Sequence, residues 1–173
     1  MTSILKVTEI QDPTNSNSAL TIDSSGRVSL PQIPCACVTL TTSNTQDGTT
    51  PYSTTGADIL FDTVTVNQGS VYNSSNGRFT APIAGIYEFS YSFLKDQDSS
   101  ADYTYIDVYK NGSQYIAAGG RLYDENPTDY GNMSQSLLVS LAANDYLTLR
   151  MVDGGIYINA NGIYSSVFFK FVG

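Results

Sequence analysis

The sequence contains no histidine and no tryptophan, and it is poor in basic residues. Without an imidazole, the chain cannot form a Ser-His or Cys-His couple, a histidine general base or a histidine-bearing zinc site. Only 8 Lys and Arg stand against 16 Asp and Glu, so the formal net charge is -8. This balance argues against nucleic acid and against an anionic membrane surface as partners. We therefore expect a protein that is not an enzyme and that needs no cofactor.

Cysteine is also scarce, since Cys35 and Cys37 are the only two in the chain. In a strand, residues two apart point to the same face at a separation that suits an intrachain disulfide poorly. We expect two reduced, buried thiols that act as small apolar side chains, with interchain bridging around a symmetry axis as the alternative. A metal site would need two further ligands of matching type, and the chain has no other cysteine to supply them.

Long apolar runs are missing as well. No stretch approaches the length of about 18 apolar residues that a membrane span requires. Residues 1–6 lack an apolar run of signal-peptide length, so we expect a protein made in a cytoplasm and not secreted by a signal of its own. At 173 residues the chain suits one domain with a short appendage.

The residues that are abundant favour strands and turns. Thirteen Tyr and seven Phe, with frequent Val, Ile and Thr, favour strands, and the Asp-rich acidic residues favour loops. Asn111-Gly112 is the strongest hairpin signal, and Asn144-Asp145 predicts a second turn. This alternation of short strands and turns predicts an all-β antiparallel sandwich in residues 35–173. Its ten strands are expected at 35–42, 58–66, 70–72, 78–81, 85–95, 103–110, 113–118, 132–142, 146–152 and 164–172.

One spacing pattern within these strands resembles the signature of a known family. Its eight positions are Phe61, Asn67, Tyr72, Phe79, Gly85, Tyr87, Phe89 and Tyr91. This spacing is similar to that of the complement-one-q globular head, whose jelly-roll fold is akin to tumour necrosis factor. The resemblance spans residues 35–173 and implies a ten-stranded jelly-roll sandwich that forms a homotrimer.

The last predicted strand, 164–172, is apolar on both faces, which concerns how the trimer would assemble. Val167, Phe169 and Phe171 lie on one face of this strand while Phe168 lies on the other, and one sandwich core explains only one apolar face. The resemblance implies that the strand belongs to the inner sheet of the trimer. The candidate interface residues are Phe168, Phe169, Phe171, Tyr87 and Tyr91.

A second candidate surface lies on the strand 103–110. Ile106 and Val108 can face the core there, which would turn Tyr103, Tyr105 and Tyr109 outward. Outward tyrosines suit contact with a glycan or a protein partner. Cross-strand packing beneath a neighbouring loop or subunit is the alternative.

Two groups of acidic residues suggest a possible metal. Asp96, Asp98 and Asp102 lie close together in sequence and could present several oxygens to calcium. The second group contains Asp124, Glu125 and Asp129. Neither group matches a specific calcium loop, and the favoured interpretation is solvated loop acids.

A boundary near Pro31 and Pro34 separates residues 1–34 from the sandwich. This segment predicts a short β-ribbon stem, with a hairpin formed by residues 19–23 and 27–30. Residues 4–28 resemble the opening of virion structural proteins of tailed bacteriophages, particularly cyanophages. The resemblance implies that the stem anchors the protein to a particle. The anchor candidates are Ile4, Val7, Ile10, Leu20, Ile22 and Val28.

These features together predict a virion protein made in the host cytoplasm. Its jelly-roll heads would form a trimeric fibre or spike that attaches to a host-surface glycan or protein, while the stem binds other virion proteins. One alternative is a capsid decoration protein. The other is an extracellular lectin-like recognition module.

Overall fold

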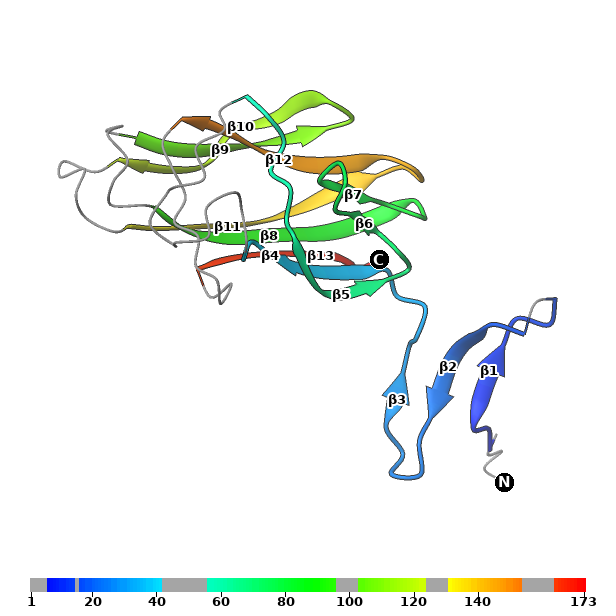
Figure 1. Ribbon diagram of the computed structural model, residues 1–173. Helices are drawn as coiled ribbons and strands as arrows, with labels where there is room; N and C mark the ends of the chain where they lie inside the picture. Colours follow the sequence, from blue (N-terminus) through cyan, green and yellow to red (C-terminus); the bar gives the residue numbers. More distant parts are fainter. Residues whose placement is uncertain (1–5, 15, 42–55, 96–102, 124–130, 154–163) are drawn as a thin grey trace. The chain divides into compact units, whose positions relative to one another are not determined.

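The computed structural model describes residues 6–14, 16–41, 56–95, 103–123, 131–153 and 164–173 (Figure 1). All of the regular elements in these ranges are β-strands, and no helix in them could span a membrane. The chain divides into two compact units, an N-terminal unit of residues 1–33 and a head of residues 34–173.

The N-terminal unit is a three-stranded antiparallel sheet in the order β1-β2-β3. The Oδ1 atom of Asp23 accepts hydrogen bonds from the backbone N–H groups of Ser25 and Arg27, at 2.8 and 2.9 Å. These bonds, with Gly26 at a φ of 76°, close the turn that leads from β2 to β3. The strands are β1 (Glu9–Gln11), β2 (Ser18–Ile22) and β3 (Val28–Ser29).

The head consists of two antiparallel five-stranded sheets that lie as two layers (Figure 1). Sheet 1 has the order β11-β8-β13-β4-β5, and sheet 2 has the order β10-β9-β12-β7-β6. Three of the four neighbouring pairs in sheet 1 and two of the four in sheet 2 are not consecutive in the chain, because the connections cross between the layers as in a jelly roll. The predicted all-β jelly-roll class is confirmed.

The strands of sheet 1 are β4 (Cys35–Thr39), β5 (Thr63–Gln68), β8 (Gly85–Lys95), β11 (Gly131–Leu141) and β13 (Ser165–Phe171). The strands of sheet 2 are β6 (Tyr72–Asn73), β7 (Arg78–Thr80), β9 (Tyr103–Lys110), β10 (Ser113–Tyr123) and β12 (Tyr146–Asp153).

Aromatic rings from both sheets form the core of the head. The aromatic residues at alternate positions of β8 are buried, which confirms the predicted face of this strand. Phe79 of β7 contacts the rings of Phe61, Phe89 and Phe169, with centroid distances between 5.3 and 6.3 Å. The buried aromatic residues on β8 are Tyr87, Phe89, Tyr91 and Phe93.

Polar bonds at the edge of this core explain two signature residues. The amide of Asn67 accepts a hydrogen bond from the Tyr72 N–H and donates one to the Tyr72 carbonyl, both at 2.9 Å. The Tyr72 hydroxyl accepts from the Phe61 N–H at 2.8 Å and donates to the Phe61 carbonyl at 3.0 Å. Asn67 and Tyr72 thereby satisfy backbone groups that the sheets leave unpaired.

Two predicted strands differ from the structure. The strand predicted at 58–66 begins only at Thr63, because Asp58 forms an isolated bridge with Arg150 of sheet 2 and the chain then crosses to sheet 1. The strand predicted at 113–118 extends to Tyr123 as β10, with register shifts where it pairs with β9. The hydrophobic periodicity of the sequence could not reveal either the crossover to sheet 1 or the register shifts between β9 and β10.

Gly85 gives the first prediction. Its φ is 155°, and a Cβ atom there would lie 2.5 Å from Cε2 of Phe171 and 2.7 Å from the Gly173 carbonyl oxygen. We expect Gly85→Val to lower the unfolding free energy by more than the ~1 kcal/mol typical of a point substitution, since both neighbours must move. Calorimetric melting temperatures would measure the effect.

Gly56→Ala is the matched control for this prediction. Gly56 also has a positive φ, 77°, but a Cβ atom at this position would meet nothing within 4 Å. The loss of stability in this control therefore measures backbone strain alone, without the close approach of a side chain to neighbouring atoms. Equal losses for the two variants would show that the packing around Gly85 is unimportant.

Candidate interaction surface

Sheet 1 has one face on the core and one face that sheet 2 does not cover. Val167 and Phe169 of β13 are 0% exposed, whereas Phe168 between them is 48% exposed. Because successive side chains of a strand point to opposite faces, Phe168 marks the outer face of sheet 1.

The strand register shows which residues share this outer face with Phe168. Phe168 lies opposite Cys37 of β4 and Ser90 of β8, and Cys37 lies opposite Val66 of β5. A neighbouring row joins Cys35, Lys170, Glu88 and Leu138. The exposed apolar residues on or beside this face are Val66, Ile86, Leu138, Phe168 and Val172.

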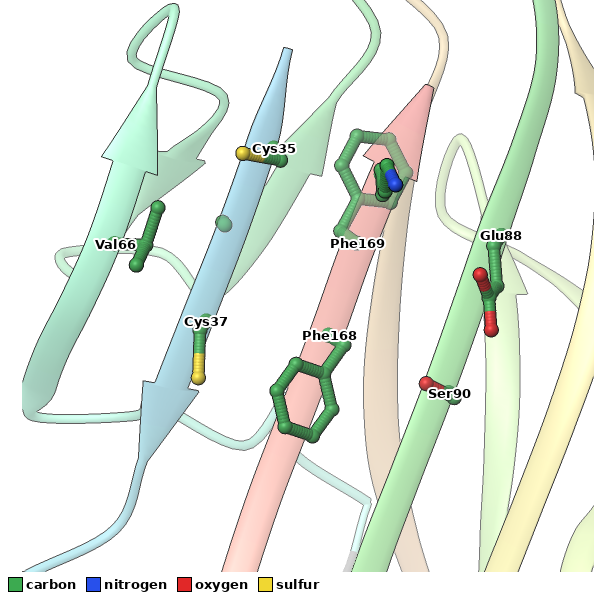
Figure 2. A pocket seen from close by; sticks show the side chains of 9 residues that line it. Cys35, Cys37, Val66, Glu88, Ser90, Phe168 and Phe169 are labelled. Carbon is green, nitrogen blue, oxygen red and sulfur yellow. The ribbon is translucent and has the colours of Figure 1, made fainter. Parts of the chain in front are cut away.

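A shallow hollow lies in this face over β4, β13 and β8 (Figure 2). Phe168, Val66 and the two cysteines supply most of its apolar lining. Lys170 and Glu88 carry opposite charges on directly paired positions, an arrangement that stabilises neighbouring strands and leaves the face without net charge. The hollow is therefore suited to another apolar surface.

The described residues contain no cluster of metal ligands. No group of three His, Cys, Asp or Glu side chains lies close enough to hold a metal ion in the ranges that the structure describes. The calcium candidates Asp96, Asp98 and Asp102, and the second acidic group of Asp124, Glu125 and Asp129, lie outside the described residues. Calcium binding by these loops stays a prediction.

The two thiols lie on β4 at the edge of the hollow. Cys35 and Cys37 are free and half-buried, and Figure 2 shows them on one strand beside Phe168 of the next. Burial raises the pKa of Cys37, because a thiolate would lose its hydration there. A protonated thiol in this position packs as a small apolar side chain.

Four of the five predicted interface residues need correction. Tyr87, Tyr91 and Phe169 are at most 2% exposed within one chain, so they offer no area to a partner. Phe171 is partly buried and packs edge-on against Tyr87, with ring centroids 5.3 Å apart. All four lie on the core side of their strands. Of the five candidates, only Phe168 presents a large exposed surface.

The outward tyrosines of β9 are only partly available. The guanidinium carbon of Arg150 lies 4.0 Å from the ring centroid of Tyr109, and Arg150 also pairs with Asp58, with Nη2 2.8 Å from Oδ1. The ring of Tyr109 thus makes a cation–π contact with Arg150, which covers part of it. Tyr105 is half-buried, and the side chain of Tyr103 lies outside the described residues.

The anchor candidates divide among several environments. Ile10 and Val28 are 49% and 59% exposed, while Leu20 and Ile22 are half-buried. Val7 precedes β1 and is 36% exposed. Ile4 lies outside the described residues.

Sequence reasoning missed several residues of the outer face. Val66, Ile86 and Leu138 belong to three strands, and their common face follows from pairing that is not visible in any one of them. The only available signal was alternation, since Ile86 and Phe168 each precede a buried aromatic residue.

Comparison with known proteins places these features in a family. The C1q domain model matches residues 42–172. The complement C1q tumor necrosis factor-related protein 3 of Homo sapiens is 27% identical over 108 residues, which is 62% of this chain and 42% of that protein. The collagen alpha-1(X) chain of Mus musculus is 32% identical over 116 residues, or 66% of this chain and 15% of that protein. The chain thus spans less than half the length of either relative.

Solved structures share the fold at low sequence identity. The globular domain of zebrafish complement 1qA superposes with a TM-score of 0.60 at 12% identity, over 80% of this chain and 96% of that one. The Eiger TNF from S. frugiperda gives a TM-score of 0.61 at 11% identity, over 82% and 94%. At this identity the likeness concerns the fold alone.

The half-buried thiol of Cys37 gives the second prediction. Because burial raises the pKa of Cys37 above its ordinary value of 9.0, little thiolate forms at neutral pH. In the Cys35→Ser variant, alkylation of Cys37 by iodoacetamide should be slower at pH 7.5 than alkylation of a cysteine peptide, and its half-maximal rate should fall above pH 9. A rate equal to that of the peptide would mean that the thiol is solvated.

Proposed function

Because the chain belongs to the C1q domain family, we propose that it is a homotrimeric recognition protein whose heads associate through the outer face of sheet 1. The observation that carries the proposal is the exposed ring of Phe168 in an apolar hollow without net charge. Contiguous exposed apolar surface of this kind marks an interaction site.

The composition of this face supports contact with identical copies. Ser90, Ser92 and Ser134 lie on the same face as Phe168, and small side chains allow close approach of another backbone. Glu88 and Lys170 already face each other across paired strands, so a partner need not bring a compensating charge. An aromatic side chain at the centre of such a surface contributes most of its binding energy.

The surfaces away from sheet 1 would carry recognition. Tyr115 on β10, an edge strand of sheet 2, is 47% exposed, and half-buried Tyr105 lies on the neighbouring β9. Tyrosine combines an apolar ring with a hydroxyl, which suits contacts with a glycan or a protein. The proposed ligand is therefore a surface glycan or protein.

The N-terminal unit would attach the trimer to a larger assembly. The resemblance that the sequence of residues 4–28 suggested is the ground for a virion fibre that contacts the host, and a capsid decoration protein is the related form. The similarity of the head to human and mouse C1q-related proteins supports an extracellular recognition module instead. The number of copies that copurify with particles separates the two virion forms, since decoration needs many more copies than a fibre.

The third prediction tests the head interface. Phe168→Asp would place a charge in a desolvated apolar layer, which costs several kcal/mol, so this variant should be monomeric. Tyr115→Asp is the matched control, because Tyr115 is 47% exposed and Phe168 is 48% exposed. Light scattering after gel filtration should give a trimer for the control and for the unmodified protein. A monomeric unmodified protein would refute the proposed assembly.

The fourth prediction tests attachment. A variant that begins at Pro34 keeps both sheets of the head and should remain folded and trimeric, yet it should no longer sediment with particles that lack the native copy. The full chain should be retained on the same particles. Equal retention of both forms would place the attachment site in the head, and retention of neither would favour the extracellular module.

A further inference from the structure

The sheet of the N-terminal unit has one apolar face. Ile10 of β1 pairs with Leu20 of β2, and Ile22 of β2 pairs with Val28 of β3. Directly paired residues share a face, and Leu20 and Ile22 are two apart on one strand, so all four side chains lie on the same side. We call this the apolar stem face: Ile10, Leu20, Ile22 and Val28.

The opposite face of this sheet is polar. Glu9, Thr21 and Ser29 form one cross-strand row there, and the hydroxyl oxygens of Thr21 and Ser29 lie 2.5 Å apart in a hydrogen bond. The ion pair between Arg27 and Asp23 lies in the exposed turn between β2 and β3, outside the apolar stem face. The sheet is thus amphipathic, and only its apolar side needs a cover.

Nothing within the described N-terminal unit covers that side. Every residue of the buried hydrophobic core belongs to the head, and Ile10 and Val28 remain 49% and 59% exposed. A three-stranded sheet this short cannot bury enough surface alone, because a stable sheet requires a second layer. We therefore expect the second layer to come from outside the described N-terminal unit.

We propose that the apolar stem faces of three chains pack against one another and form a three-sided β-stem with an apolar interior. The inference rests on the proposed head trimer and adds a second homotypic interface to it. The central strand β2 places Leu20 and Ile22 nearest the axis of the stem, while Glu9, Thr21 and Ser29 face the solvent.

Two features favour identical copies over a foreign partner. Within β1, β2 and β3 the apolar stem face carries no charged side chain, so three identical faces can meet there without burying an unpaired charge. The connection from β3 to β4, the first strand of the head, is only residues 30–34, which reach about 17 Å when fully extended. In a head trimer, this tether would hold the three stem sheets together at millimolar effective concentration.

Disulfide trapping in the full chain tests the β-stem. Leu20→Cys and Thr21→Cys would be compared in a Cys35→Ser/Cys37→Ser background, so that no native thiol competes. Both positions are half-buried neighbours on β2, but only Leu20 lies on the apolar stem face. Under mild copper-phenanthroline oxidation, the Leu20→Cys trimer should form interchain disulfides at least tenfold faster than the Thr21→Cys trimer.

Each outcome of this experiment decides a different point. A trimer in which both positions link at equal rates, or in which neither links, would refute the β-stem and leave the head interface intact. A monomer by light scattering would refute both proposals.

Hydrogen exchange provides a second measurement that needs no cysteine. Amides of residues 18–22 should exchange at least tenfold more slowly in the unmodified trimer than in the Phe168→Asp monomer, because packing protects the central strand. Equal exchange in the two proteins would overturn the inference even if the cysteine variants failed to fold.

Discussion

The aromatic contacts between the two sheets are the interaction on which the head depends. Phe79 of sheet 2 touches Phe89 and Phe169 of sheet 1, at centroid distances of 5.3 and 5.9 Å. Rings of this size bury a large apolar area, and tilted or edge-on pairs add further stabilisation. Once these rings occupy the core, their neighbours on each strand must point outward. The position of Phe168 is therefore a consequence of the burial of Phe169.

The same alternation explains why the two faces of sheet 1 differ in character. The core face carries large aromatic side chains, whereas the outer face combines Phe168 and Leu138 with serines and the Glu88–Lys170 pair. A solvated face would normally be more uniformly polar. The mixture of exposed apolar and small residues fits a surface that is covered in an assembly.

Turn motifs and residue alternation predicted most strands and turns well. They did not predict how the strands pair or which distant residues touch. Asn111 and Gly112 have φ values of 51° and 79°, as the Asn-Gly hairpin signal requires. Asn111 also donates a hydrogen bond to Asp145 of the next predicted turn at 2.7 Å, a bond that helps lower the pKa of Asp145 to about 2. This link between two correctly predicted turns was invisible in the sequence. The burial of Phe169 and the contact between Arg150 and Tyr109 were invisible for the same reason, because both depend on how the strands pair.

The two units share one physical problem, since each has an apolar sheet face that no other described strand of the same unit covers. A threefold arrangement of heads would cover the outer face of sheet 1 and also bring three short tethers together. Loop-closure entropy for the stem would then be small, because association of the heads has already restricted the chain ends. Association of the three stem faces releases little net free energy while the heads are separate. It becomes much more favourable once the heads are joined. Formation of the head interface should therefore precede and promote order in the N-terminal unit.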